Sequence, residues 1–156
     1  MHRILKLTVL SLFVLSAVAR AADDPLARTW KLNVAKSKFD PGPAPQALTN
    51  KYDAAGQNTL KLTQDGVDAK GDKTHAEDTI VFDGKELPMK NFPIADAQMN
   101  RRVDANTTER TRTKGGKLVN YLIRSISPDG KTMTMKQIGF NAEGKAFSNI
   151  EIFEKQ

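Results

Sequence analysis

The 156-residue sequence predicts an all-β protein, an antiparallel up-and-down meander of about nine strands closed into a barrel. From Ala47 to the C-terminus, runs of about six to nine residues rich in Thr, Val, Ile and Leu alternate with short turn signals. No segment shows a long, clean helical periodicity, which argues against an α/β fold. Short loops favour sequential strand neighbours, and full closure removes both sheet edges. A two-sheet β-sandwich is the alternative.

An export signal is predicted at residues 1–21, followed by a single domain at residues 22–156. A basic head precedes an apolar run at residues 7–18, which is too short to span a bilayer. Residues 19–21 read Ala-Arg-Ala, which supplies the small side chains that signal peptidase requires. We therefore expect a periplasmic or secreted protein with no membrane span after cleavage.

The composition limits the classes of partner. The chain has 24 Lys and Arg against 18 Asp and Glu, but three of the basic residues belong to the leader, so the mature charge is +3. This modest charge argues against nucleic acid as a partner. The chain has no cysteine, so an exported domain of this size needs a core or closed sheet that is stable without disulfides. We expect a monomer.

The first strand is predicted around Trp30, the only tryptophan, within the segment Leu26–Phe39. Strand alternation puts Leu26, Trp30, Leu32 and Val34 on one face, so Trp30 is expected to be buried against the sheet.

Two irregular connections interrupt the strands. Asp40–Gln46 contains three prolines, which remove backbone donors and exclude a helix or a central strand, so it is expected to be a surface connector. Asn91–Ala97 is the one longer irregular connection. Gly, Asn, Asp and Pro mark the remaining turns, which are Ala54–Gly56, Ala69–Asp72, Asp83–Gly84, Asp104–Asn106, Gly115–Gly116, Pro128–Gly130 and Ala142–Gly144.

The opening of the mature chain resembles a known group of proteins. Thr29-Trp30-Lys31-Leu32-Asn33, then Ala35-Lys36-Ser37-Lys38-Phe39 and the proline-rich loop, look like the start of small exported bacterial lipocalin-like, calycin-type β-barrel proteins, which are mostly uncharacterised. Lipocalins and fatty-acid-binding relatives open with G-x-W, whereas Arg28 stands here in place of the glycine. Lys155 is the only counterpart of their basic residue in the last strand. The resemblance implies a closed barrel with a ligand cavity and does not identify the ligand.

The sequence gives little support for a metal site or for a catalytic nucleophile. His75, the only histidine of the mature chain, lies near Glu77 and Asp78, but neither a second histidine nor a cysteine completes a metal site. A catalytic triad needs a base beside its nucleophile, and no G-x-S-x-G motif occurs. No catalytic residue, metal or cofactor is therefore predicted.

Pairing the hairpins predicts what faces the interior. If Pro128–Gly130 is a three-residue turn, Ser127 pairs with Lys131. One face of the last four strands then carries Thr108, Arg110, Arg112, Val119, Tyr121, Ile123, Ser125, Met133, Met135, Gln137, Gly139, Phe147, Asn149, Glu151 and Phe153. Leu122 and Phe140 fall on the opposite face with the polar residues, against the pattern. The length of the Asp104–Asn106 turn decides whether Arg101 or Arg102 points inward.

Charged groups on an inner face need an explanation, because burial costs several kcal/mol per ion unless the charge is paired. The set predicts a water-filled cavity with a polar ligand site, a packed Arg110–Glu151 pair, or a register that is one residue out of phase. Interior arginine and tyrosine hold a carboxylate in fatty-acid-binding relatives, which is the role that the resemblance implies for Arg110, Arg112 and Tyr121.

The leading hypothesis is an exported, non-enzymatic binding protein that holds a small amphipathic, hydrophobic or anionic ligand inside the barrel. The candidate ligand-binding residues are Arg110, Arg112, Tyr121, Gln137, Asn149, Glu151 and Arg101, and the candidate cavity wall is Trp30, Ile123, Met133, Met135 and Phe153. One alternative is an envelope protein-interaction or structural module with a packed core. The other is a small enzyme that uses Glu151 and Tyr121 as acid and base.

Overall fold

The computed structural model describes residues 24–89, 92, 94–141 and 143–156. The predicted export signal at residues 1–21 lies outside them, as does part of the predicted 91–97 connection. One 3-10 turn, η1 (Val34–Lys36), accompanies eleven strands. They are β1 (Thr29–Leu32), β2 (Lys38–Asp40), β3 (Ala47–Gly56), β4 (Thr59–Val67), β5 (Lys73–Val81), β6 (Glu86–Pro88), β7 (Ala97–Arg102), β8 (Thr107–Lys114), β9 (Lys117–Ile126), β10 (Thr132–Phe140) and β11 (Ala146–Lys155).

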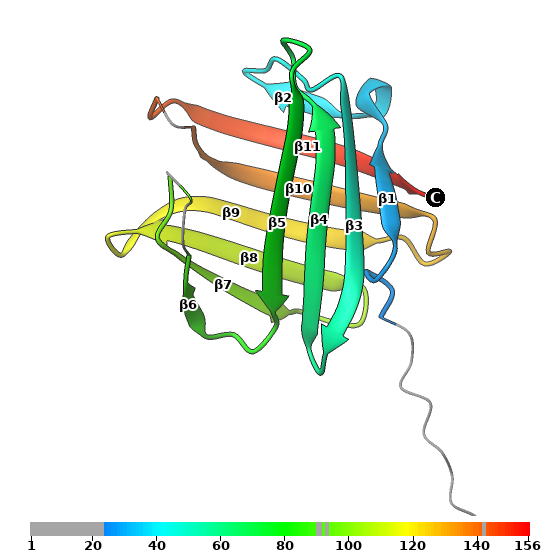
Figure 1. Ribbon diagram of the computed structural model, residues 1–156, viewed down its shortest axis with the longest axis vertical. Coiled ribbons are helices and arrows are strands. Elements are labelled where there is room, and N and C mark those ends of the chain that lie inside the picture. The colour runs from blue at the N-terminus through cyan, green and yellow to red at the C-terminus, as the bar shows by residue number, and fades with distance from the viewer. Residues whose placement is uncertain (1–23, 90–91, 93, 142) are drawn as a thin grey trace, which may run out of the picture.

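The strands form one antiparallel sheet that curls on itself, in the order β5-β4-β3-β1-β11-β10-β9-β8-β7-β6. In Figure 1, β3, β4 and β5 lie in front and cross β7 to β11 behind them. β1 pairs with both β3 and β11, so the first strand joins the two layers. Within the described residues, β5 and β6 end the hydrogen-bonded path and are not paired with each other.

The predicted all-β meander barrel is confirmed. The count exceeds nine because β2 and β6, of three residues each, add short pairings to β11 and β7. The proline-rich segment connects β2 to β3, as expected from its missing donors. Val34 leaves the strand that was expected to contain it, because the Asn33 side chain accepts a hydrogen bond from the Lys36 amide and caps η1.

Trp30 is fully buried at one end of the barrel, as its strand position predicted. Its Nε1 donates to the Leu26 carbonyl at 3.1 Å, so the polar atom of the indole is satisfied. The surrounding cluster is almost entirely apolar and closes this end, and its members are Leu26, Leu32, Tyr52, Leu60, Leu62, Ile80, Phe82, Leu122, Ile126, Met133, Met135 and Phe153.

The predicted register of β9 is wrong by one residue. Ile126 pairs with Met133, and the Ser127 amide donates to the Thr132 carbonyl, so the turn after β9 has four residues instead of three. Each side chain from Asn120 to Ile126 therefore changes face. Tyr121 and Ile123, predicted inside, point outward.

A β-bulge in β9 restores the predicted register for the neighbouring strand β8. Arg112 pairs with Asn120 while Thr113 pairs with Leu118, which leaves Val119 as the extra residue. Gly139 lies opposite this bulge, where an added Cβ would sit 2.5 Å from the Val119 carbonyl oxygen. Because the bulge cancels the longer turn, β8 keeps the predicted orientation, with Arg110 and Arg112 inside.

Candidate ligand cavity

The half of the barrel away from Trp30 is hollow. Polar side chains interrupt or follow the apolar inward residues of three strands: Gln64 follows Leu60 and Leu62 in β4, Arg124 lies between Leu122 and Ile126 in β9, and Gln137 follows Met133 and Met135 in β10. The polar residues line a cavity of about 1010 Å³. This volume suits a small organic ligand.

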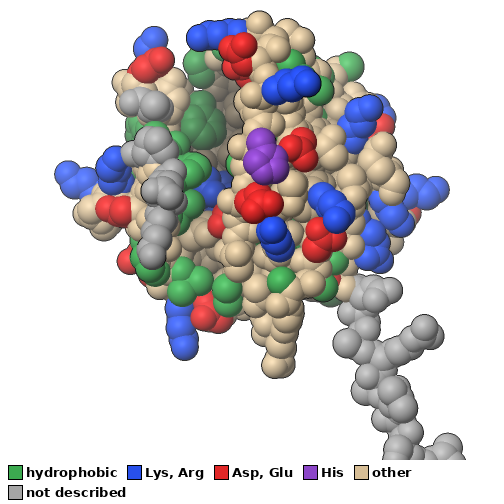
Figure 2. Space-filling model, in the orientation of Figure 1, with side chains coloured by type: hydrophobic (Ala, Val, Ile, Leu, Met, Phe, Trp, Pro, Cys, Tyr) green, Lys and Arg blue, Asp and Glu red, His purple; other side chains and the backbone are tan. Residues whose placement is uncertain are grey.

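The cavity opens beside the unpaired edge of β5. Residues of both faces of β5 line it, and Leu87, Pro88, Met89 and Phe92 line the other side of the opening. Figure 2 shows the opening as a hollow next to His75, which is drawn in purple. The gap between β5 and β6 is thus a lateral slot into the interior.

Two arginines in the cavity lack both full hydrogen bonding and an ion pair among the described residues. Arg124 is 1 % exposed, and neither its Nε nor its Nη1 has a partner among the described residues. Arg110 is 7 % exposed and donates from Nη2 to Asn120 Oδ1 at 3.2 Å, while its Nε is unpartnered. The nearest aromatic contact of Arg124 is the Tyr52 ring, 5.8 Å away. Unpaired buried donors are costly, so these groups favour an acceptor brought in from solvent.

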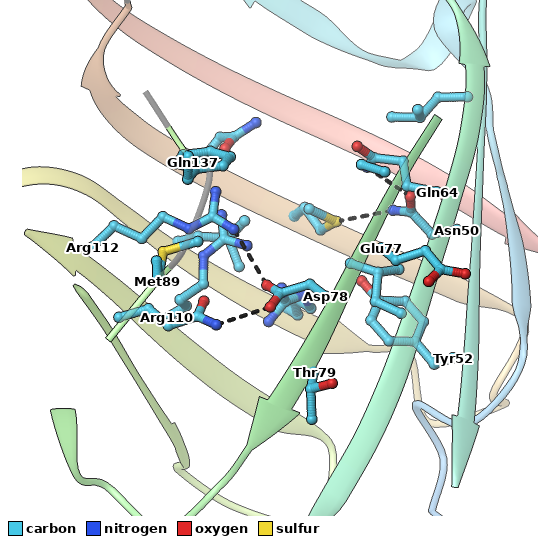
Figure 3. A pocket seen from close by; sticks show the side chains of 18 of the residues that line it. Asn50, Tyr52, Gln64, Glu77, Asp78, Thr79, Met89, Arg110, Arg112 and Gln137 are labelled. Atoms are coloured by element: carbon cyan, nitrogen blue, oxygen red, sulfur yellow. Dashed lines mark hydrogen bonds and ion pairs between the residues drawn. The ribbon is translucent and has the colours of Figure 1, made fainter. Parts of the chain in front are cut away.

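Arg112 also has an unpartnered Nε, but unlike Arg110 and Arg124 it forms an ion pair. Its Nη2 lies 3.4 Å from Asp78 Oδ2, and its guanidinium stacks 4.3 Å from the centre of the Phe92 ring. Asp78 also accepts from Gln98 Nε2 at 3.0 Å. Figure 3 shows Asp78 facing Arg112. Asp78 therefore connects β5 to β7 and β8 across the slot.

Burial and neighbouring positive charge lower the pKa of Arg110 and Arg112. Burial lowers the pKa of Arg110 well below its usual value, and the charges of Arg112 and Arg124 lower it further. Burial also lowers the pKa of Arg112, with Asp78 opposing the effect. The protein thus keeps positive charge in a buried environment, which costs desolvation free energy, and a bound anion would offset this cost.

Glu151 supplies the second interior carboxyl group. It is 4 % exposed and accepts a hydrogen bond from Gln137 Nε2. Burial raises its pKa, while hydrogen bonds from Gln137 and Asn149 and the nearby arginine charges oppose the rise. No ion pair joins Glu151 to Arg110 within the described residues, so the predicted packed pair is not formed.

The structure divides the predicted site residues. Arg110, Arg112, Gln137, Glu151 and Met135 line the cavity. Asn149 faces the same side but pairs with Phe39, and its Oδ1 lies 3.4 Å from the Asp40 amide.

Other predicted residues lie elsewhere. Arg101 is on the outer surface, bound to Glu109, because the Asp104–Asn106 turn has the length that turns Arg102 inward. Tyr121 donates to the same Glu109 at 2.9 Å. Ile123 pairs with Glu109 on this outer face. Since Tyr121 and Glu151 lie on opposite faces of the sheet, the acid and base pair considered for an enzyme is not assembled.

Trp30, Met133 and Phe153, predicted as cavity wall, belong instead to the packed end. Each is 0 % exposed and absent from the cavity lining.

Sequence reasoning missed several lining residues, namely Asn50, Tyr52, Gln64, Asp78, Gln98, Leu122 and Arg124. One signal pointed to Leu122 and Arg124. Leu122 was an apolar residue on a face predicted to be polar, which is the mark of a strand one residue out of phase. Nothing local pointed to Asp78, which meets β7 and β8 only through the curl of the sheet.

Within the described residues, no group of His, Asp and Glu side chains is arranged to hold a metal ion. His75 Nδ1 lies 2.7 Å from Asp65 on the exposed surface, and this hydrogen bond raises its pKa. The part of the chain that the structure describes also contains no helix long and apolar enough to cross a membrane.

No family model matches the sequence, and no curated protein matches it. Solved structures do resemble the fold. A Schistosoma mansoni fatty acid binding protein in complex with arachidonic acid aligns with a TM-score of 0.58 at 10% identity, over 85% of this chain and 96% of that one. Zebrafish ileal bile acid-binding protein with cholic acid gives 0.54 at 11% identity, over 85% and 99%. The extracellular fatty acid binding protein As-p18 gives 0.54 at 17% identity, over 85% and 97%. These likenesses establish a calycin-type barrel fold.

Proposed function

We propose that this chain is an exported, non-enzymatic binding protein that holds a small amphipathic molecule with an anionic group inside its barrel. The observation that carries the proposal is the unpartnered guanidinium N–H groups of Arg110 and Arg124 at a cavity of about 1010 Å³. A bound anion would pair those donors and offset the buried positive charge. The apolar lining from Leu48, Leu62 and Met135 suits the remainder of an amphipathic ligand.

The solved structures of like fold support this proposal by analogy. Two of them are described with arachidonic acid and cholic acid, which are amphipathic acids. Fold alone does not determine function, so the arginine geometry carries the argument and the comparison adds to it.

Native mass spectrometry of the protein purified from its source should show a co-purifying small molecule. Titration calorimetry with that molecule then tests the site. Arg110→Ala should weaken binding by about 1.5 to 3 kcal/mol, the scale of a charged hydrogen bond. Arg101→Ala is the matched control, because this arginine is bound to Glu109 on the outer face. Equal affinities for wild type and Arg110→Ala would reject the site.

The proposed location depends on residues 1–21 acting as a cleaved export signal. Intact-mass analysis of the exported protein should find a chain that begins at Ala22 or Asp23. A membrane-bound species that retains residues 1–18 would contradict export as a free protein.

A second candidate is a protein-interaction module that uses the outer surface. Ile138, Phe140 and Ile150 are 53%, 48% and 40% exposed on neighbouring strands β10 and β11. Clustered exposed apolar residues often mark interfaces. If this surface is an interface, analytical ultracentrifugation should show a complex between the wild type and a partner protein, and Ile138→Ser should lose that complex.

A further inference from the structure

We propose that Asp78 is a specificity-determining residue, a built-in counter-ion that restricts the cavity to ligands whose head group carries a single negative charge. This inference rests on the proposed function. It adds that the cavity distinguishes singly charged from doubly charged head groups, which the binding of an anion does not by itself require.

The position of Asp78 is the first argument. It lies on β5, next to the slot, and its two carboxylate oxygens are both engaged, Oδ1 by Gln98 and Oδ2 by Arg112. Figure 3 shows Asp78 pointing from β5 toward Arg112 on the opposite side of the cavity. All three arginines have an unpartnered Nε, but the charge of Arg112 is neutralised by Asp78, whereas Arg110 and Arg124 have no ion pair among the described residues.

The count of interior charges is the second argument. Three guanidinium groups, those of Arg110, Arg112 and Arg124, share the cavity interior with the carboxyl groups of Asp78 and Glu151, whereas Glu77 and His75 line its exposed rim and are paired there with Lys61 and Asp65. With all five ionised, the interior holds one excess positive charge. A singly charged head group balances it, while a doubly charged one leaves the interior negative.

The arrangement of these charges is the third argument. A head group bound to Arg110 and Arg124 shares a poorly hydrated space with Asp78 and Glu151, both of which are largely withdrawn from solvent. Like charges interact strongly there because water does not screen them. The second charge of a dianion therefore meets repulsion without a free cation to offset it. Converting Asp78 to a neutral residue releases Arg112 and removes one of the repelling carboxylates.

Two matched probes separate the effect of charge from that of shape. Decyl sulfate carries one negative charge at every pH used, and decyl phosphate carries two at pH 8.5, because its second pKa is about 6. The ratio of their dissociation constants is measured by calorimetry for each protein. Wild type should prefer decyl sulfate, and Asp78→Asn should shift the ratio toward decyl phosphate by about tenfold, the equivalent of 1.4 kcal/mol.

The control variant is Asp53→Asn, which makes the same change of charge on β3 at a residue that does not line the cavity. The Asp53 carboxylate is 49% exposed and lies 2.8 Å from Lys51, so the ratio should stay at its wild-type value. The double variant Asp78→Asn with Arg112→Gln restores the interior charge and should return the ratio toward wild type. A ratio unchanged in Asp78→Asn, or shifted equally in Asp53→Asn, overturns the proposal.

A measurement on the wild type alone keeps the test valid if Asp78→Asn does not fold. Lowering the pH from 8.5 to 5.5 protonates decyl phosphate to its singly charged form, so its affinity should rise relative to decyl sulfate. No relative rise overturns the charge rule. If neither probe binds wild type at all, the proposed anion-binding function fails instead, so the two failures are distinguishable.

Discussion

The two halves of the barrel interior are built from the same strands and have opposite contents. Around Trp30 the strands contribute apolar side chains that fill the space, and the one polar atom of the indole is hydrogen-bonded. Around Arg110 charged and carboxamide groups, several without partners, lie among apolar side chains such as Leu62 and Leu122, and the space is open. The comparison indicates that the packed half stabilises the barrel, whereas the polar half lowers its stability and contains the proposed binding site.

The largest effect is expected from breaking the packed half. Trp30→Ala removes the largest fully buried side chain and should lower the free energy of unfolding by about 3 to 5 kcal/mol, as large-to-small core substitutions do. Urea unfolding followed by circular dichroism measures the loss. Leu118→Ala, at a side chain that is 54% exposed, should change the stability little. A loss below about 1 kcal/mol for Trp30→Ala would contradict the assignment of the core.

Gly139→Ala tests the bulge that gives the polar half its orientation. The added methyl group would lie 2.5 Å from the Val119 carbonyl oxygen and 3.1 Å from Asn120 Cα, so backbone must move. We expect a loss of about 1 to 3 kcal/mol, the usual range for overpacking, in the same urea assay. Ser148→Ala, at an exposed position of β11, is the control. An unchanged unfolding midpoint would mean that β9 is not bulged at Val119.

Arg124→Met tests whether the polar half trades stability for binding. The free energy of unfolding and the affinity for decyl sulfate should change in opposite directions. Removing a buried, incompletely paired charge should raise the free energy of unfolding by roughly 1 to 2 kcal/mol, while the affinity for decyl sulfate should fall. Thermal unfolding and calorimetry give the two values. Lys136→Met, on the exposed face of β10, should change neither. A variant that is both less stable and unaltered in binding would show that Arg124 is structural.

The smallest expected effect concerns Glu151. Burial raises the pKa of Glu151 in the folded protein above 4.5. In the pH window between 4.5 and this raised pKa, the folded protein retains a proton that the unfolded chain releases. The free energy of unfolding should therefore fall as the pH rises through the window, and Glu151→Gln should flatten this part of the profile. Each unit of pKa difference corresponds to about 1.4 kcal/mol.

Glu154→Gln provides the control for that pH profile. The pKa of Glu154 is lowered by its hydrogen bond with Lys36, so its contribution to stability is lost only as the pH falls below 4.5. The profile of this variant above pH 4.5 should follow that of wild type. A Glu151→Gln profile with the same slope as wild type above pH 4.5 would indicate that Glu151 is not buried as described.

Sequence reasoning succeeded where a residue's environment depends on its own strand. The turn signals from Ala54 onward marked the hairpins, and alternation around Trp30 identified a buried face. The positions of Arg110 and Arg112 were also correct, but for an incomplete reason. A turn one residue longer than assumed and a bulge at Val119 shift the register in opposite senses, so two unrecognised features cancelled for β8 and left β9 reversed.

By itself, the amino-acid sequence determined the antiparallel meander, the burial of Trp30 and the presence of charge on an inner face, because each follows from period-two alternation and turn chemistry over a few residues. Only the tertiary structure decided that Tyr121 faces solvent, that Arg124 is buried and that Asp78 meets Arg112. Turn length and bulges are set by the fit between neighbouring strands. The approach of β5 to β7 and β8 is set by the curvature of the whole sheet, for which no short segment carries a signal.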